Sequence, residues 1–535
     1  MKKISKILTA VVLGLLSAAG FSQTLISSFG TEADGSVNLP DGTVLSGEYI
    51  LDTRTYVIGG RTVFIEPGTV FKAESKANPE DAVTFVVSRG GKVYAMGTEE
   101  QPIVFTTVED PLDGTYSVQN KEKWGGVVVL GYAQNSVLAS ETNPEDPFNL
   151  TGITDGVAFV EGLPYPDERH HYGAADTLAD GTPIFVNDDN SGVLRYVSIR
   201  HGGTEIATNN EINGLTMGSV GSGTTIEHIE VVSNGDDGIE FFGGTVDMKY
   251  VNIMFCEDDY IDYDQGWTGR IQFMMGLQLP ATVSTTTGQD DVTIQYGDNG
   301  MECDGDDGYK SGRPAGLSSP QIFNATIIGN GADEGLELKE RTNGLIGNSV
   351  LSNFSSAVQF NDGEDGSSDI GHRTSEEFAA GRLRVANNLF LNYGTAVRVD
   401  GTDLDGTNTP ASLEADLVAD GNVFLATSTL IDDDVEAVIN DGLDAFTNKF
   451  NAVPNAGATE FNTDLLPDFS DGFFEYAPYR GAFEPGKESW LVNWTVHELK
   501  GTGNVSCPYD VTGDFKVNAS DFAAIVGAYG DDCNE

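Results

Sequence analysis

The chain has 535 residues, of which 82 are acidic and 29 are basic, and its formal net charge is -53. A surface this negative repels phosphate, which excludes nucleic acid and anionic membranes as partners bound by general electrostatic attraction. Hydrophobic residues make up 39% of the sequence and aromatic residues 9%, so a packed core is expected. Glycine occurs 65 times, which indicates many tight turns.

Residues 1–22 have the pattern of a secretory signal peptide. Lysines precede an apolar run over residues 7–19, and small residues follow up to Ser22. The run is shorter than the roughly 20 residues that a membrane-spanning helix needs. We therefore expect cleavage after export, no membrane insertion of the mature protein, and a secreted, extracellular or cell-surface location. Residues 23–45 would form a lead-in to the next domain.

From about residue 50 to residue 430, short apolar strands alternate with turns rich in Gly, Asn and Asp. Six strands share a frame of two apolar residues around a polar one; the apolar pairs are Ile239 and Phe241, Ile261 and Tyr263, Met301 and Cys303, Leu336 and Leu338, Val358 and Phe360, and Val397 and Val399. This alternation is typical of a strand with one buried face. The frames at Asp237 and Asp259 are 22 residues apart. This spacing matches stacked coils and is too short for a propeller blade. A propeller and a β-sandwich are the alternative folds. We predict an all-β fold, a single-stranded parallel β-helix over residues 46–500 with an end cap from about residue 440.

Several stretches of the sequence resemble a known superfamily. The block from Asn213 to Trp267, with the run Ser233-Asn-Gly-Asp-Asp-Gly-Ile-Glu-Phe, is similar to secreted right-handed parallel β-helix proteins of the pectate-lyase-like superfamily, and so is Trp124-Gly-Gly. Tyr479-Arg-Gly-Ala-Phe resembles the end of such domains in secreted proteins of marine Bacteroidota. The resemblance covers roughly residues 45 to 500 and implies a right-handed solenoid. It implies no single activity, because this fold hosts lyases, hydrolases, epimerases, adhesins and structural proteins.

The polar residue of each frame belongs to a row that is mostly acidic. In chain order the row is Glu240, Asp262, Glu302, Glu337, Gln359 and Arg398. Alternation places the row on the solvent face, and coils about 4.8 Å apart make its carboxylates near neighbours. Such carboxylates must share a proton or hold a cation, and Ca2+ is the hard cation expected outside a cell. The row is either a solvated or calcium-bridged face that stabilises the coil, or part of a glycan groove between Asp236 and Arg341.

The groove interpretation supplies candidates for catalysis and binding. Gly235-Asp-Asp-Gly is similar to the paired-Asp motif of polygalacturonase-like hydrolases, although the Gly-His-Gly and Arg-Ile-Lys of that family are missing. A general acid and base could be two carboxylates from Asp236, Asp237, Asp258 and Asp259, and Asp237 and Asp259 are our candidates. Glu334, Glu337, Lys339 and Arg341 bear some resemblance to the Glu-x-Glu and Lys/Arg arrangement of the alginate and chondroitin lyase group, which uses Ca2+ and a basic residue, although the spacing differs. The other candidates, for cation binding or for stacking on sugars, are Asp236, Glu240, Tyr260, Asp262, Asp264, Trp267, Glu302, Glu334 and Arg341.

The chain contains four cysteines, in two separate regions. Cys256 lies before one strand of the repeat and Cys303 near the end of another, which places them ~20 Å apart, too far for a disulfide. We expect both to be buried free thiols. Cys507 and Cys533 bracket a compact tail over residues 501–535, and we expect them to be bonded in an oxidising compartment.

The tail contains a twelve-residue loop with the spacing of a calcium site. Oxygen ligands at its positions 1, 3, 5, 7, 9 and 12 would be Asp510, Thr512, Asp514, the carbonyl of Lys516, Asn518 and Asp521. A short helix is expected directly after it. The loop resembles one EF-hand-like segment of a type I dockerin, which implies Ca2+. A dockerin has two such segments, and Phe515 and Asp521 replace the usual Gly and Glu, which argues against a cohesin-like partner.

These features favour a secreted, calcium-binding β-helix that binds polysaccharide or a surface protein, or that forms surface structure. The alternative is a polysaccharide lyase or glycoside hydrolase that acts on an acidic polysaccharide in a groove along the solenoid. Both hypotheses use the same carboxylates, so their arrangement in three dimensions decides what they can do.

Overall fold

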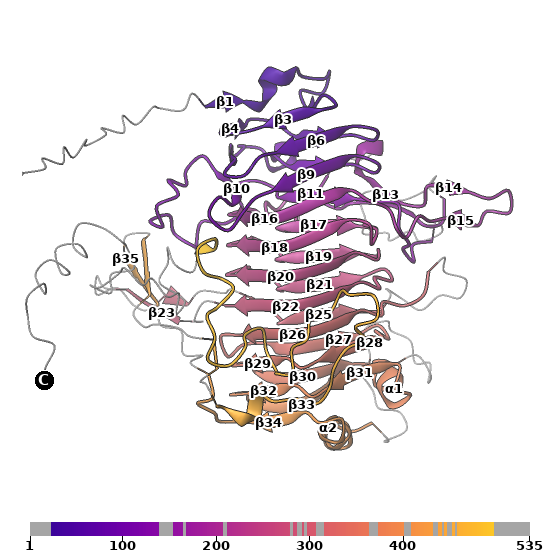
Figure 1. Ribbon diagram of the computed structural model, residues 1–535, viewed down its shortest axis with the longest axis vertical. Helices are drawn as coiled ribbons and strands as arrows, with labels where there is room; N and C mark the ends of the chain where they lie inside the picture. Colours follow the sequence, from indigo (N-terminus) through magenta and orange to yellow (C-terminus); the bar gives the residue numbers. More distant parts are fainter. Residues whose placement is uncertain are drawn as a thin grey trace, which may run out of the picture.

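The computed structural model describes residues 23–138, 154–163, 167–206, 211–278, 282–285, 292–293, 297–305, 315–362, 373–400, 408–431, 437–440, 443–446, 452–454 and 457–496. Within these ranges the chain coils into two long sheets of parallel strands around one apolar interior (Figure 1). The predicted parallel β-helix is confirmed. The predicted signal peptide and the tail, with its calcium loop and the pair Cys507 and Cys533, lie outside the described residues.

The first sheet has 17 strands. They are β1 (Thr24–Leu25), β3 (Thr43–Leu45), β4 (Glu48–Leu51), β6 (Thr62–Ile65), β7 (Val70–Ala73), β9 (Lys92–Met96), β10 (Ile103–Thr107), β16 (Gly192–Arg200), β18 (Thr225–Val232), β20 (Asp247–Met254), β22 (Arg270–Leu277), β26 (Gln321–Ile328), β28 (Gly344–Gly347), β29 (Val350–Ser352), β31 (Leu383–Ala386), β32 (Leu389–Leu391) and β34 (Val423–Leu425). The long strands β16, β18, β20 and β22 each contain one residue with positive φ, namely Tyr196, His228, Tyr250 and Phe273. Strand pairing skips these four residues, and their rings stack on one another with centroids 4.2, 4.5 and 5.1 Å apart.

The second sheet has 11 strands and carries the predicted frames. They are β2 (Val37–Asn38), β5 (Thr55–Val57), β8 (Phe85–Val87), β11 (Val127–Leu130), β17 (Leu215–Gly218), β19 (Ile239–Phe242), β21 (Ile261–Asp264), β25 (Met301–Asp304), β27 (Glu334–Lys339), β30 (Ser356–Asn361) and β33 (Thr395–Asp400). Ile239 pairs with Ile261 and Phe241 with Tyr263, and the later frames continue this register, as predicted. Cys256 is buried and free, and so is Cys303, which confirms both predictions.

Both ends of the solenoid are covered by apolar side chains. Ile26, on the 3-10 helix η1 (Ile26–Phe29), is fully buried over the first coil, and residues 23–45 already contribute strands β1, β2 and β3 to the sheets. Leu413 and Leu417, on α2 (Pro410–Ala419), are buried beside β33, the last strand of the second sheet. Such covers protect the unpaired strand edges from pairing with another chain.

The remaining elements lie outside the two sheets. They are the antiparallel pairs β12 (Val157–Phe159) with β13 (His171–Gly173) and β14 (Asp176–Thr177) with β15 (Pro183–Ile184), the strands β23 (Thr282–Thr285), β24 (Val292–Thr293), β35 (Ala437–Asn440) and β36 (Leu443–Phe446), α1 (Thr374–Ala379), and the 3-10 helices η2 (Pro79–Asp81), η3 (Glu168–His170) and η4 (Thr459–Phe461). The strands β12 to β15 belong to an insertion between β11 and β16.

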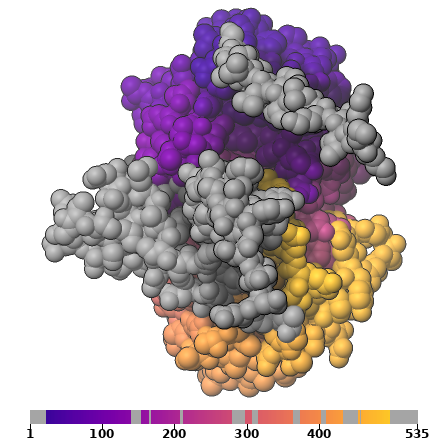
Figure 2. Space-filling view, turned by 60° about the vertical axis from the view of Figure 1, so that its left-hand side comes forward, coloured from indigo at the N-terminus to yellow at the C-terminus, as the bar shows by residue number. Residues whose placement is uncertain are grey.

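Residues 457–496, which we call the C-terminal strap, run back along the first sheet. Figures 1 and 2 show this segment, in yellow, beside coils that belong to the middle of the chain. Asn348 donates to the carbonyl of Leu465 at 2.8 Å, and the N–H of Val496 donates to the buried carboxylate of Glu230, also at 2.8 Å. The strap thus joins coils that are far apart in sequence instead of forming only the end cap predicted from residue 440.

Candidate functional site: an acidic groove

The outer row of the second sheet changes character along the solenoid. Its residues, one per coil, are Tyr56, Val86, Val128, Thr216, Glu240, Asp262, Glu302, Glu337, Gln359 and Arg398. The first three pack beneath the insertion, against residues such as Ala158 and Tyr172, and the acidic part begins where this cover ends. Glu240 and Gln359 are only 6% and 4% exposed, so the prediction that the whole row faces solvent is wrong. Glu161, from the insertion, lies against Glu240 and helps to bury it.

A second row, at the turn before each strand, uses its side chains to hold successive coils together. Asp237 accepts a hydrogen bond from the backbone N–H of Asp259 at 2.9 Å. Asp259 accepts from the N–H of Asn299, and the amide oxygen of Asn299 accepts from the N–H of Glu334 at 3.3 Å. These buried acceptors satisfy backbone donors that would otherwise be unpaired. The two predicted catalytic aspartates therefore support the turns as well as carrying charge.

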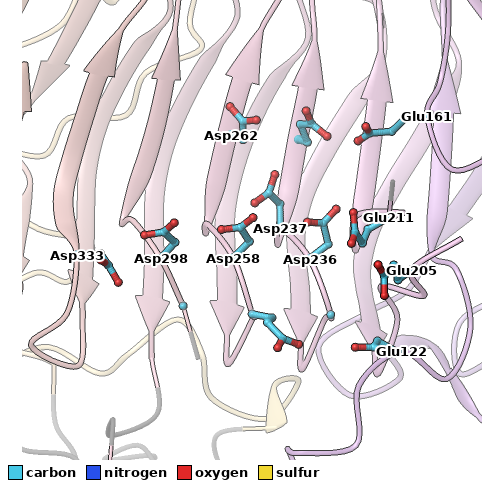
Figure 3. A pocket seen from close by; sticks show the side chains of 14 residues that line it. Glu122, Glu161, Glu205, Glu211, Asp236, Asp237, Asp258, Asp262, Asp298 and Asp333 are labelled. Atoms are coloured by element: carbon cyan, nitrogen blue, oxygen red, sulfur yellow. The ribbon is translucent and has the colours of Figure 1, made fainter. Parts of the chain in front are cut away.

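Beside these rows lies a groove of about 760 Å³ that is lined almost entirely by carboxylates (Figure 3). Its lining residues are Glu122, Glu161, Glu205, Glu211, Gly235, Asp236, Asp237, Glu240, Glu257, Asp258, Asp262, Gly297, Asp298 and Asp333. Figure 3 shows Asp236, Asp258, Asp298 and Asp333 following one another from coil to coil. Among the described residues, the lining contains no lysine, arginine or histidine.

The crowding of these carboxylates makes their ionisation unfavourable. Burial, together with the nearby Glu302, raises the pKa of Asp258 to about 6. Burial and the neighbouring Asp333 raise the pKa of Asp298 to about 7. The pKa values of the more deeply buried Asp237 and Glu240 are also raised, first by burial and then by adjacent carboxylates. The groove therefore needs protons or cations to relieve its charge.

Four groups of carboxylates have the spacing of cation ligands. In each trio, one oxygen from every residue lies within 4.8 Å of the others; the trios are Asp236, Asp237 and Asp258; Asp237, Glu240 and Asp262; Asp258, Asp259 and Asp298; and Asp262, Glu302 and Asp304. Asp262 Oδ1 and Asp304 Oδ1 are buried and have no hydrogen-bond partner within the described part of the chain. Hard divalent cations prefer such oxygen ligands, so the residues present fit Ca2+.

Comparison with known proteins agrees with this architecture. Residues 37–148 and 182–427 match the family described as pectate-lyase like beta helix domain. The chain belongs to this family. No curated protein matches the sequence. Among the described residues, no helix is long and apolar enough to cross a membrane.

Two solved structures are similar to this family member at low sequence identity. The crystal structure of pectate lyase Pel9A has 13% identity and a TM-score of 0.34, with 83% of this chain and 98% of that chain covered. The full-length tailspike protein 2 from the Escherichia coli O157:H7 bacteriophage CAB120 has 11% identity and a TM-score of 0.24, with 73% of this chain and 48% of that chain covered.

The two other predicted catalytic residues, Lys339 and Glu337, form ion pairs and hydrogen bonds with neighbouring side chains. Lys339 forms ion pairs with Glu302 and, at 3.5 Å, with Asp304, both on the preceding coil. Although burial acts in the opposite direction, these carboxylates raise the pKa of Lys339, so the side chain stays protonated and is unsuited to act as a base. Glu337 accepts hydrogen bonds from Asn299, Gln359 and Asn361, at 3.2, 2.8 and 3.3 Å.

The aromatic residues predicted for sugar stacking are in the interior. Tyr260 and Trp267 are fully buried, and the Trp267 ring stacks on Phe241 with centroids 3.9 Å apart. Their predicted role in a binding groove is wrong, because the turn preceding β21 and the segment following it direct both rings into the core. Arg341 instead pairs with Glu377, on α1, at 2.7 Å.

The predicted residues divide into those that line the groove and those that stand beside it. Asp236, Asp237, Glu240 and Asp262 line it, whereas the remaining candidates, Asp259, Asp264, Glu302, Glu334, Glu337, Lys339 and Arg341, do not. Glu334 is paired with Arg398 at 2.7 Å. The prediction missed Glu122, Glu161, Glu205 and Glu211, which come from segments outside the repeat and therefore have no frame position to identify them.

Proposed function

We propose that this protein is a secreted, calcium-binding β-helix that binds polysaccharide outside the cell or at its surface. The single observation that carries the proposal is the groove, in which twelve of the fourteen lining residues are carboxylates from the stacked coils and the adjoining loops. A cleft that concentrates one sign of charge recruits ligands of the opposite sign. Cations are therefore its first ligands.

Calcium is the cation that the site chemistry favours. Carboxylate oxygens from two neighbouring coils converge in each trio, and Ca2+ accepts six to eight oxygen ligands in flexible geometry. Water and the ligand itself would complete the coordination of each ion. The raised pKa values of Asp258 and Asp298 mean that a bound ion would displace protons near neutral pH.

Polysaccharide association is supported by the shape of the groove and by the family. The carboxylates continue over several coils along the solenoid, which suits an extended polymer better than a compact ligand (Figure 3). The family is described as pectate-lyase like, and the name pectate lyase denotes an enzyme that acts on a polysaccharide. A polysaccharide is the class of ligand that fits both the extended groove and the family.

Two measurements test this function. Isothermal titration calorimetry of the metal-free protein with Ca2+ should show several binding events, and Mg2+ should bind more weakly because it demands a stricter octahedral geometry. A glycan array probed with the labelled protein, with and without a chelator, should show polysaccharide binding. A protein that binds neither Ca2+ nor any glycan would contradict the proposal.

Glycoside hydrolysis is the second candidate function, and Asp258, Asp259 and Asp298 favour it. Their oxygens lie within 4.8 Å of one another, and the pKa values of Asp258 and Asp298, about 6 and about 7, allow one carboxyl to stay protonated while another is ionised. Retaining glycosidases use two carboxyl groups about 5 Å apart in this way. A reducing-sugar assay on a polysaccharide panel would detect hydrolysis, and ultraviolet absorbance of unsaturated uronates would detect lyase activity.

The tail would add one further calcium ion to those of the groove. The ligand spacing from Asp510 to Asp521 supports a single EF-hand-like loop, and a bond between Cys507 and Cys533 would hold the tail together. The segment would then serve as a calcium-dependent knob for attachment to a surface partner. Mass spectrometry of the secreted protein before and after reduction checks the disulfide and the removal of residues 1–22.

A further inference from the structure

We propose that the C-terminal tail, residues 497–535, docks on an exposed apolar row of the first sheet near the start of the solenoid. The contact uses the predicted helix from Phe522 to Tyr529, directly after the calcium loop. The tail lies outside the described residues, whereas every residue of the row lies within them. This inference goes beyond the proposed polysaccharide binding, because it gives the tail a partner within its own chain.

The first sheet carries an apolar row on the outer face of its first coils. The side chains of the row, one per coil, are Val44, Phe64, Tyr94 and Val193. Val44 is 54% exposed and Phe64 is 40% exposed, and the rings of Phe64 and Tyr94 stack with centroids 5.5 Å apart. Met96, on the same face of β9, is 47% exposed. Exposed apolar side chains that adjoin one another in this way mark an interaction surface, whereas single ones need no explanation.

The same row becomes polar on the coils that follow, where the strap covers the sheet. The register neighbour of Val193 is Thr225, and the next residue of the row is Asp247. Asp247 pairs with Arg270 of β22 at 2.6 Å, and Arg270 also pairs with the strap residue Asp471. The strap therefore binds the row through charged groups and leaves the apolar side chains of β3, β6 and β9 exposed.

The course of the strap brings the tail to this row. Trp490 lies edge-on against Tyr250 of β20, with centroids 5.5 Å apart. Three residues later, Asn493 donates to the carboxylate of Glu99, just after β9, at 2.6 Å. The described part of the strap ends at Val496, and Figure 1 shows the upper end of the strap, in yellow, near β18. The tail therefore begins within a few strands of β9, β6 and β3.

The tail has the length and the apolar pattern that this contact requires. Val496 is bound at β18, and four strand spacings of ~4.8 Å, roughly 19 Å in total, separate β18 from β3. Residues 497–521 can span several times that distance at ~3.3 Å per residue. In the predicted helix, Phe522, Ile525, Val526 and Tyr529 have the spacing of one apolar face. Such a helix is stable when that face packs against a sheet.

Charge and connectivity favour the tail over a second copy of the chain. A second copy would bring a further net charge of -53 to the contact, which opposes association. The tail is tethered beside the row, and this raises its effective concentration there. Lys92, on the same face of β9 as Tyr94, offers an ammonium group to Asp531 or Asp532, which follow the helix. The calcium ligands from Asp510 to Asp521 precede the helix and stay available.

Photo-cross-linking of the full secreted chain in Ca2+ tests the proposal. The photoreactive residue p-benzoylphenylalanine replaces Phe64 in one protein and Val44 in a second, and mass spectrometry identifies the peptide that each captures. We expect capture of the peptide that contains Phe522 to Tyr529, from the same chain. The control position is Val418, which is 53% exposed on α2 at the far end of the solenoid. Its yield of tail cross-link should be at least about tenfold lower.

The other outcomes of the cross-linking overturn the proposal. Cross-linked dimers on a denaturing gel would show that the row binds a second copy. Capture of a different segment, or equal capture of the tail from Val418, would show that the tail has no site on the row. No cross-link to the tail from either Val44 or Phe64 would leave the predicted helix to a surface partner. None of these outcomes affects the tests of calcium and glycan binding by the groove.

A pair of matched variants locates the contact on the tail. Ile525→Asp with Val526→Asp places two charges on the apolar face of the predicted helix, and we expect about tenfold less cross-link from position 64. Ala524→Asp with Ala528→Asp adds the same charge to the opposite face and should leave the yield unchanged. Equal loss in both variants would show that the apolar face is not the contact and would overturn the proposal. Thermal melting verifies that the solenoid of each variant is folded.

Discussion

The carboxylate of Asp237 accepts a hydrogen bond from the backbone N–H of Asp259, one coil further along the solenoid, at 2.9 Å. Asp259 repeats this contact toward Asn299, and Asn299 repeats it toward Glu334 with an amide oxygen. Because a neutral amide serves at the third step, the turn requires an acceptor and not a charge. The turn therefore does not need a charge on Asp237, and its carboxyl group is available to the groove to carry a proton or bind a cation.

The first prediction separates these two roles of Asp237. Asp237→Asn keeps an acceptor for the Asp259 N–H and removes one of several crowded charges, so we expect unchanged or higher stability in chelator. Asp237→Ala leaves that N–H buried without a partner and should lower the free energy of unfolding by about 1 to 2 kcal/mol. Thermal and urea unfolding of the two variants check this. Equal destabilisation by Asn and Ala would show that the turn needs the charge itself.

The second prediction concerns Lys339. Lys339→Met leaves Glu302 and Asp304 without their cation, and removing one partner of a largely buried ion pair costs about 3 kcal/mol. We expect the loss in chelator and partial recovery with Ca2+, which can replace the ammonium. Arg384→Met is the control, because its pair with Asp420 is 3.5 Å apart and exposed, and such pairs contribute less than about 1 kcal/mol. The interpretation fails if Lys339→Met and Arg384→Met melt alike at every Ca2+ concentration.

The third prediction is that the free energy of unfolding decreases as pH rises when divalent cations are absent. Asp258, Asp298 and Glu211 have pKa values of about 6, about 7 and about 7 in the folded chain, above the usual values of 3.8 and 4.5. The folded state therefore binds more protons than the unfolded state between about pH 4 and pH 7, and stability decreases across this interval. In chelator the melting temperature should drop from pH 5 to pH 7.5, and saturating Ca2+ should reduce that drop. A melting temperature that rises over the same interval would contradict the assignment.

The repeat made the fold and its register predictable. A polar residue between two apolar ones recurs in β19, β21, β25, β27, β30 and β33, so the alternation alone placed Glu240, Asp262 and Glu302 in one outer row. Burial of that row was not predictable in the same way. Glu161 covers Glu240 from an insertion that has no repeat of its own, and a chain segment without periodicity gives no position to compare.

The candidate site was predictable only where it uses the repeat. Asp236 and Asp262 occupy frame positions, whereas Glu122 and Glu205 reach the groove from loops whose path depends on tertiary contacts. For Trp267 the error is the opposite one, because the prediction placed this residue in the groove and the structure places it in the core. A tryptophan close to a row of acidic residues suggests sugar stacking, yet its ring is buried against Phe241, because large aromatic surfaces stabilise the interior of the solenoid.

The fourth prediction concerns the loop in the tail. Asp510→Ala with Asp514→Ala removes two of the predicted oxygen ligands, so the measured calcium stoichiometry should fall by one ion while glycan binding by the groove persists. Asp531→Ala with Asp532→Ala, outside the twelve-residue loop, is the matched control and should leave the stoichiometry unchanged. Calorimetric titration with Ca2+ gives the calcium stoichiometry of both double variants. An unchanged stoichiometry in the first variant would place all of the bound calcium elsewhere.

The fifth prediction is that Trp494 fastens the C-terminal strap to the bends of the first sheet. Its ring is 2% exposed and meets Tyr196 and His228 edge-on, with centroids 5.5 and 5.8 Å apart. Trp494→Ala should lower the free energy of unfolding by about 3 kcal/mol and speed amide hydrogen exchange in the strap more than in the sheets. Tyr476→Ala is the control, because this side chain lies on the same strap and is 71% exposed. If exchange accelerates uniformly in both sheets of the Trp494 variant, the strap is part of one cooperative unit and not a separately fastened segment.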